Sequence, residues 1–272
     1  MDITSLGYRT DIMLRLLEGS ERSDHGDHIV VRSPANPSYW WGNFLLLAAP
    51  PAPGGAGRWL SRFAAEFPTA GHVTLGIDVT DRSAVDPAEF EAAGLTFRRE
   101  TVLTAAEAHQ PPHPNRAAEY RPLAGSADWQ QAIELRADCI GAEEPPADRS
   151  FLESRIAAQR GLAEAGNGRW LGAFTGGRLV AQLGIFTDSN GIARYQDVET
   201  HPAARRQGLA GTLVYHAGRY ALAQLAASTL VIVAEPDQQA IRVYRSCGFE
   251  VTEDQVCFER APGVSPDTAA NG

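Results

Sequence analysis

The feature that most constrains this chain is the stretch Arg205-Arg206-Gln207-Gly208-Leu209-Ala210, between a strand-like run at 193–200 and a long helical pattern at 207–226. The pattern predicts a strand, a short loop and a helix. The first backbone N–H groups of such a helix have no partner within it, and the helix dipole adds partial positive charge there. A pyrophosphate suits that end, since Gly208 and Ala210 let it approach the backbone. The stretch predicts a phosphate-binding loop.

Spacing alone leaves an alternative open. The stretch lacks the Gly-Lys-Ser/Thr ending of a P-loop and the three glycines of a dinucleotide fingerprint. An ordinary connection with a small residue for packing would have the same letters.

A second block, Asp237-Gln238-Gln239-Ala240-Ile241-Arg242-Val243-Tyr244-Arg245-Ser246-Cys247-Gly248-Phe249, follows a predicted strand at 229–234. The two blocks, in this order, resemble the GNAT family of N-acetyltransferases. That family has an Arg/Gln-x-x-Gly-x-Gly/Ala signature after its fourth strand, then an Asn-x-x-Ala-x-x-x-Tyr-x-x-x-Gly-Phe helix and turn. Asp237 stands where the family usually has Asn, and either residue can cap a helix. The resemblance spans residues 118–260.

The resemblance implies an α+β protein whose C-terminal domain, residues 119–260, has the GNAT fold: a mixed, mostly antiparallel sheet flanked by helices. It implies acetyl-CoA as cosubstrate, with the pantetheine arm in a gap between the fourth and fifth strands and the pyrophosphate on the loop. The residues it assigns to acetyl-CoA are Val198, Thr200, Arg205, Arg206, Gln207, Gly208, Leu209, Ala210 and Asp237.

Tyr244 matches the family's tyrosine acid. A phenol has a pKa near 10, so it holds a proton at neutral pH that it can give to a leaving thiolate. The alternative is that Tyr244 only packs against the sheet.

The general base is less defined. Strand alternation puts Arg194 and Gln196 on the face where family bases often sit, and Asp197 and Glu199 on the other. A β-bulge would exchange the faces beyond it. We take Glu199 as the candidate base, with Asp197 second; solvated surface carboxylates or a chain of waters are the alternatives.

The N-terminal half, at 28–105, has the predicted order strand, strand, helix, strand, helix, strand, as in the second half of a GNAT domain. The loop at 49–57 has the wrong spacing for a cradle. We therefore expect a smaller, degenerate GNAT-like α/β domain at 1–105 that has lost cofactor binding, as in tandem relatives. An unrelated small α+β domain is the alternative. The proline-rich stretch 106–118 predicts a linker, and 261–272 a disordered tail.

Two adjacent tryptophans, Trp40 and Trp41, lie before the apolar run 44–47. In a strand they would point to opposite faces, and an exposed one could line an acceptor site. Packing of both rings is the alternative.

Composition narrows the function classes. A net charge of −9 argues against nucleic acid or an anionic membrane as partner. All 24 positions counted as lysine or arginine are arginine, which excludes a lysine nucleophile and lysine self-acetylation. Cys139, Cys247 and Cys257 are scattered and, like the histidines, lack metal-ligand spacing, so we predict no metal. The cysteine usage and the absence of a signal-like or bilayer-length apolar run predict a cytoplasmic protein.

The sequence therefore predicts an acetyl-CoA-dependent N-acetyltransferase acting on a primary amine of a small molecule or peptide. The acidic composition favours a cationic metabolite, and a homodimer stays open. Two alternatives remain: a non-catalytic acyl-CoA sensor of the same fold, and an acyltransferase that uses a longer acyl-CoA.

Overall fold

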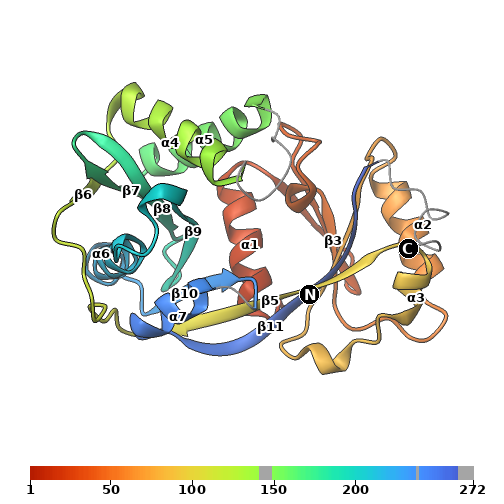
Figure 1. The fold of residues 1–272 in the computed structure, drawn as a ribbon. Helices are drawn as coiled ribbons and strands as arrows, with labels where there is room; N and C mark the ends of the chain where they lie inside the picture. The colour runs from red at the N-terminus through yellow and green to blue at the C-terminus, as the bar shows by residue number, and fades with distance from the viewer. Residues whose placement is uncertain (141–148, 237–238, 263–272) are drawn as a thin grey trace. The chain divides into compact units, whose positions relative to one another are not determined.

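A computed structural model describes residues 1–140, 149–236 and 239–262 (Figure 1). The chain forms two compact units. The first contains residues 1–102 together with the C-terminal strand from Thr252, and the second spans Leu103–Val251. The second unit thus begins and ends earlier in the chain than the C-terminal domain expected at 119–260.

The first unit has a sheet of strand order β1-β2-β3-β4-β11-β5. Its elements are α1 (Leu6–Leu17), β1 (Glu21–Asp24), β2 (His28–Arg32), β3 (Phe44–Leu47), α2 (Ala56–Glu66), β4 (Val73–Ile77), α3 (Ala88–Ala92), β5 (Thr96–Ala105) and β11 (Glu250–Arg260). Both faces of the sheet are covered. Ile29 and Leu46 pack with α1, whereas Val30 and Leu45 pack with α2 on the other face. This explains why β2 and β3 are apolar runs rather than alternating ones.

Strand β11 is the element whose partner the sequence does not indicate. It pairs antiparallel with β4, with Val256 opposite Ile77 and Arg260 opposite Val73. Tyr8 of α1 fixes it further, since the Tyr8 hydroxyl donates to Val256 O over 2.5 Å. The last strand of the chain thereby completes the core of the first unit.

In the first unit, the helix that follows a parallel strand is α2, and a carboxylate occupies its N-terminus. The N–H groups of Gly54 and Ala56 donate to the carboxylate of Glu89 from α3, the second over 3.3 Å. The N-cap residue Gly55 supplies no side-chain acceptor of its own. An internal anion thus lies where an external phosphate would bind a helix N-terminus.

We predict that Glu89→Ala lowers the free energy of unfolding by about 1 kcal/mol, because it removes a capping carboxylate from α2. Urea unfolding measures the change. Glu91→Ala, on the same short helix and also at an exposed position, is the matched control and should change stability by less. Equal losses from the two substitutions would argue against the cap.

The second unit has a sheet of strand order β10-β9-β8-β7-β6. Its elements are β6 (Glu119–Pro122), α4 (Gly125–Ile140), α5 (Arg149–Glu164), β7 (Gly168–Thr175), β8 (Arg178–Phe186), β9 (Ile192–Thr200), α6 (Leu209–Gln224), β10 (Thr229–Ala234) and α7 (Gln239–Ser246). The neighbours from β6 to β9 are antiparallel, and β9 and β10 are parallel. Helices α4 and α5 lie on one face and α6 on the other (Figure 1). The α+β fold with a mixed, mostly antiparallel sheet is as predicted.

Two local details were not anticipated from the sequence, although packing of both tryptophan rings was one of the expected alternatives. Trp40 and Trp41 lie in a 3-10 helix (Trp40–Gly42), not in a strand, so they are not related by strand alternation. Trp40 stacks on His72 with ring centroids 5.9 Å apart, and Trp41 contacts Phe44 at 5.9 Å. Both rings pack within the first unit. The polar segment 18–27 also contains β1, which the sequence pattern did not indicate because its side chains are mostly exposed.

In the described part of the chain, no helix is both long and apolar enough to cross a bilayer. The predicted tail begins at 261, and from residue 263 on it lies outside the described residues.

Candidate functional site

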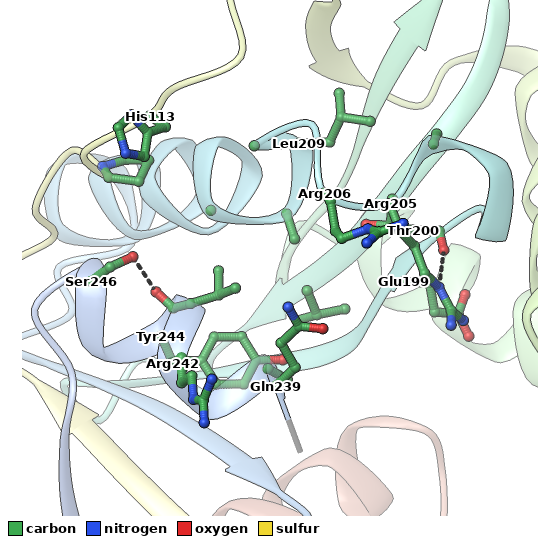
Figure 2. A pocket seen from close by; sticks show the side chains of 18 of the residues that line it. His113, Glu199, Thr200, Arg205, Arg206, Leu209, Gln239, Arg242, Tyr244 and Ser246 are labelled. Atoms are coloured by element: carbon green, nitrogen blue, oxygen red, sulfur yellow. Dashed lines mark hydrogen bonds between the residues drawn. The ribbon is translucent and has the colours of Figure 1, made fainter.

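The site is a cavity of about 1010 Å³ in the second unit (Figure 2). Its walls come from the end of β9, the loop and first turn of α6, helix α7, the end of α4, and residues 111–113. In Figure 2, Glu199, Thr200 and Arg205 lie on one side of the cavity, and His113 and Ser246 on the other. The two blocks, which 26 residues separate in the sequence, therefore meet in one cavity.

The loop before α6 has the geometry of an anion cradle. Gly208 is the N-cap of α6 with φ +76°, and Arg206 also has a positive φ of +62°. Among the described residues, the backbone N–H groups of 206–210 have no hydrogen-bond acceptor. Such amides at a helix start suit a phosphate.

The stretch 106–118, expected to be only a linker, forms a wall of this cradle. Asn115 N–H donates to Thr212 Oγ1 and Asn115 Nδ2 to Gln207 O, each over 2.9 Å. His109 N–H donates to Cys247 O over 2.9 Å. Prolines gave the linker signal, but here they shape an ordered segment, which we call the strap (residues 109–115).

Gly208 is required by both conformation and space. A Cβ there would lie 2.3 Å from His113 O of the strap, and φ +76° is unfavourable for an L side chain. We predict that Gly208→Ala lowers the free energy of unfolding by about 1–2 kcal/mol or more, measured by urea unfolding. Gly161→Ala is the control, because its Cβ would meet nothing within 4 Å in α5. That control should be neutral or stabilising by up to about 1 kcal/mol, and a neutral Gly208→Ala would refute the required contact.

Strands β9 and β10 separate toward the cavity. They pair only through Ile192, Ala193 and Arg194 of β9, although β9 continues to Thr200. On its other side His201 N–H donates to Val180 O over 2.9 Å, so the alternating backbone turns the groups of Thr200 and Val198 toward the gap. Thr200 O receives the Cys139 thiol at 3.5 Å and Arg205 Nε at 3.4 Å. The gap leaves a strand edge for a ligand with amide groups.

Tyr244 reaches the cavity from α7. It is 5% exposed, and its ring lies in the core cluster with Leu209 and Phe249. Burial, with a smaller contribution from Cys247, raises its pKa above the usual value for a phenol. Tyr244 is therefore a protonated hydroxyl at the cavity wall, and it both packs and faces the ligand space.

Strand β9 contains the bulge. Its register with β8 shifts between Gln182 and Gly184, and Asp197 has φ +48°. Before the bulge Tyr195 points to α6, where its hydroxyl donates to Val214 O over 2.8 Å. After it, Asp197 and Glu199 point to α4 on the opposite face, where both contact Arg136. The bulge thus exchanges the faces.

Asp197 and Glu199 are not solvated surface carboxylates. Arg136 Nε donates to Glu199 over 2.9 Å, and Arg136 lies 2.5 Å from Asp197. Gln182 Nε2 donates to the other Glu199 oxygen over 2.6 Å, and Gln159 Nε2 to Asp197. Only 15% of the Glu199 side chain is exposed, and of the two carboxylates only Glu199 lines the cavity.

The two carboxyls titrate in opposite directions. Burial raises the pKa of Glu199, and the charge of Asp197 adds to this against the effect of Arg136. Burial also opposes ionisation of Asp197, but Arg136 and Arg155 hold its pKa below the usual value. Glu199 is therefore the more basic of the two.

Other predicted residues fall as follows. Val198, Thr200, Arg205, Arg206, Gly208, Leu209 and Ala210 line the cavity, and Gln207 lies in the same loop without lining it. Asp237 lies outside the described residues. Two histidines of this unit, which the sequence analysis did not single out, have structural contacts. His201 accepts from Ala203 N–H and caps a 3-10 helix. Burial lowers the pKa of His216, which contacts the Tyr120 ring. Sequence reasoning missed His113, Cys139 and Arg242 as cavity residues, and no local signal marks them.

One group among the described residues is close enough to hold a metal ion: His25, His28 and Glu66, in the first unit. Arg62 lies among them. It donates to His28 Nε2 over 3.2 Å, lies 3.4 Å from His25 Nδ1, and pairs with Glu66 at 2.9 Å. A guanidinium thus takes the place where the cation would sit.

Comparison with known proteins agrees with this geometry. Residues 129–249 match the family described as Acetyltransferase (GNAT) family. No curated protein sequence matches the chain.

Solved structures share the fold over nearly the whole chain. A functionally unknown conserved protein from Staphylococcus epidermidis has a TM-score of 0.69 at 11% identity, covering 89% of this chain and 94% of its own. A GCN5-related N-acetyltransferase from Kribbella flavida has 0.65 at 17%, covering 96% and 97%. A tandem GNAT protein from the clavulanic acid biosynthesis pathway has 0.56 at 18%, covering 93% and 88%. At these identities the likeness shows the fold alone.

Proposed function

The C-terminal half of the chain belongs to the GNAT acetyltransferase family, and on that premise we propose that the protein transfers the acetyl group of acetyl-CoA to a primary amine. The acceptor is a small molecule or a peptide. The observation that carries the proposal is the meeting of three features in one cavity: the cradle at Gly208, the open edge of β9 and the hydroxyl of Tyr244.

The residues fit acetyl-CoA. The unpartnered amides of 206–210 would hold the pyrophosphate, with Arg205 and Arg206 adding charge. The backbone of Val198 and Thr200 would pair with the pantetheine amides, which satisfies the strand edge left open by β10.

The reaction joins the amine nitrogen to the acetyl carbon and breaks the bond from that carbon to sulfur. The amine must lose a proton, and the leaving thiolate must gain one. Tyr244 supplies the second proton. Glu199 accepts the first, directly or through water, since it is the carboxylate that lines the cavity and burial raises its pKa.

A non-catalytic acyl-CoA sensor is the second candidate, and one observation favours it. Both Glu199 oxygens already accept hydrogen bonds, one from Arg136 and one from Gln182. A carboxylate held this way is a weaker base than a free one. An acyltransferase with a longer acyl donor is a third candidate, which a panel of acyl chain lengths decides.

The rest of the chain completes the proposal. In the first unit the parallel strands β3 and β4 pair through Leu45, Leu46 and Leu47, so they do not separate as β9 and β10 do. The carboxylate of Glu89 occupies the N-terminus of α2. We propose that this unit binds no acetyl-CoA. The three cysteines carry free thiols, which fits a reducing, cytoplasmic setting. The net charge of −9 favours a cationic acceptor over nucleic acid or an anionic membrane.

Calorimetric titration with acetyl-CoA, followed by thiol release across a panel of amines, tests the proposal. We expect one site per chain and release of CoA with at least one amine. Binding without release across amines and acyl donors would favour the sensor. Absence of binding would refute the proposal.

A further inference from the structure

Two side chains outside the cavity, those of Asn115 and Thr212, hold the backbone of the cradle. Asn115 Nδ2 donates to Gln207 O over 2.9 Å, and the Thr212 hydroxyl donates to Gly208 O over 2.8 Å. Neither side chain lines the cavity. Two successive carbonyl groups of the cradle are therefore fixed by residues that a ligand in the cavity would not touch.

The orientation of these carbonyl groups decides where the cradle amides point. In a planar trans peptide, the C=O group and the following N–H group point in opposite directions. Because Gln207 O is bonded to Asn115, the N–H of Gly208 points away from Asn115. Because Gly208 O is bonded to Thr212, the N–H of Leu209 likewise points away from Thr212. Gly208 and Leu209 line the cavity, so both N–H groups are turned toward it.

The Asn115 side chain is fixed by its own segment. Its Oδ1 accepts from the N–H groups of Ala117 and Ala118, each over 3.0 Å, which leaves Nδ2 as the donor to the cradle. The backbone N–H of Asn115 donates to Thr212 Oγ1 over 2.9 Å. The Thr212 hydroxyl therefore bridges two segments, since it accepts from the strap and donates to Gly208 O.

The strap is also anchored at a distance from the cradle. His109 N–H donates over 2.9 Å to the carbonyl of Cys247, which directly follows α7. Pro111 is buried, and a Cβ at Gly211 of α6 would lie 3.2 Å from it. Because these contacts hold the strap independently of the cradle, Asn115 can impose an orientation on the loop.

We propose that Asn115 and Thr212 are positioning residues that preorganise the cradle and so raise the affinity for acetyl-CoA without touching it. This inference rests on the proposed function, because it takes the pyrophosphate to lie on the cradle. Without these hydrogen bonds the loop would lose conformational freedom only when the ligand binds, and ordering a loop costs free energy. The hydroxyl of Tyr244 does not depend on them, so acetyl transfer should keep its rate once the site is filled.

The pair Thr212→Val and Thr212→Ser tests the assignment. Valine has nearly the shape of threonine but cannot bridge the strap and the cradle, whereas serine keeps the hydroxyl. In calorimetric titration of the full chain, Thr212→Val should bind acetyl-CoA about three- to tenfold more weakly than the wild-type protein, the range for one hydrogen bond. Thr212→Ser should restore the affinity to within about twofold. With an amine that the wild-type protein acetylates, kcat at saturating acetyl-CoA should be unchanged in both variants.

Asn115→Ala is a second variant, which removes the donor to Gln207 O and leaves α6 unaltered. It should weaken acetyl-CoA binding in the same direction. Asn190→Ala is the matched control, because the Asn190 side chain also bonds within its own turn, with Nδ2 2.9 Å from Asp188, but lies outside the strap and the cavity. That control should leave the affinity unchanged.

The number of sites per chain in the same titrations separates a less ordered cradle from partial unfolding, which would lower that number. Wild-type affinity in Thr212→Val or in Asn115→Ala would overturn the positioning role and leave the acetyltransferase proposal intact. So would an equal loss of affinity in Thr212→Val and Thr212→Ser, or a loss of kcat at unchanged affinity. If the wild-type protein did not bind acetyl-CoA, the proposed function itself would be refuted, and this inference with it.

Discussion

The Tyr244→Phe protein is expected to keep its affinity for acetyl-CoA and to lose turnover by about 10²- to 10⁴-fold, the usual contribution of a positioned general acid. The substitution removes only the hydroxyl, so the ring still packs with Leu209 and Phe249. No described residue forms a hydrogen bond with this hydroxyl, so removing the hydroxyl leaves no buried polar group without a partner. Steady-state kcat with thiol detection and calorimetric affinity measure the two effects separately.

Tyr195→Phe is the matched control. Its hydroxyl is also buried, but it donates to Val214 O over 2.8 Å on the α6 face of β9 and does not line the cavity. That variant should lose about 1 kcal/mol of stability and keep its turnover. Full turnover in Tyr244→Phe would remove Tyr244 as the acid and return it to a packing role.

The pH dependence gives a second test of the same residue. Burial raises the pKa of Tyr244, so the hydroxyl stays protonated beyond the range of a free phenol. Ionisation of Tyr244 should therefore cause no fall in turnover below about pH 10. Any fall in turnover below that pH should be the same in the wild-type protein and in Tyr244→Phe. A decline at neutral to mildly alkaline pH, lost in that variant, would contradict a protonated Tyr244.

Arg136→Met is expected to lower the free energy of unfolding by about 3 kcal/mol, because it leaves two carboxylates without their shared cation. The Arg136 side chain is only 9% exposed and contacts both Asp197 and Glu199. This value is at the lower end of the stability losses expected when one partner of a buried ion pair is removed, because 27% of the Asp197 side chain is exposed to solvent. Urea unfolding at neutral pH measures it.

The loss should shrink in acid. The pKa of Asp197 is lower in the native protein than in the unfolded chain. This carboxylate therefore adds to stability at a pH above its pKa in the unfolded chain, and the contribution is lost as the pH falls through its pKa in the native protein. The raised pKa of Glu199 has the opposite effect. Its contribution to stability is present at a pH below its pKa in the unfolded chain and is lost as the pH rises through its pKa in the native protein. Removing Arg136 raises both native pKa values, so the variant protonates more readily. The stability difference from wild type should be larger at about pH 7.5 than at about pH 5.

Arg160→Met is the control for a surface pair. Arg160 and Glu164 are 2.7 Å apart on α5, with 41% and 61% of their side chains exposed. Its removal should change stability by less than about 0.5 kcal/mol at either pH. A loss in Arg136→Met no larger than this, or one that grows in acid, would refute the bridging role.

The sequence alone determined the elements whose signals are local. The strand, loop and helix around Gly208 follow from apolar periodicity and a small residue at the helix start. Tyr244 and the cradle residues also became candidates from the sequence, because their spacing within two short blocks is a local property, and most of them line one cavity.

Only the tertiary structure decided which distant segments meet. Strand β11 pairs with β4 of the first unit because its apolar residues Val256 and Phe258 complete the core that α2 and α3 also contact. The sequence of β11 does not indicate that β4 is its partner. The strap contacts the cradle because Gly208 leaves room for His113 O, although prolines alone suggested a linker. The bulge at Asp197 turns Glu199 to Arg136, so both carboxylates are paired, and the alternative of solvated surface carboxylates does not hold. Each of these depends on packing between residues far apart in sequence, whereas periodicity and spacing report only on neighbours along the chain.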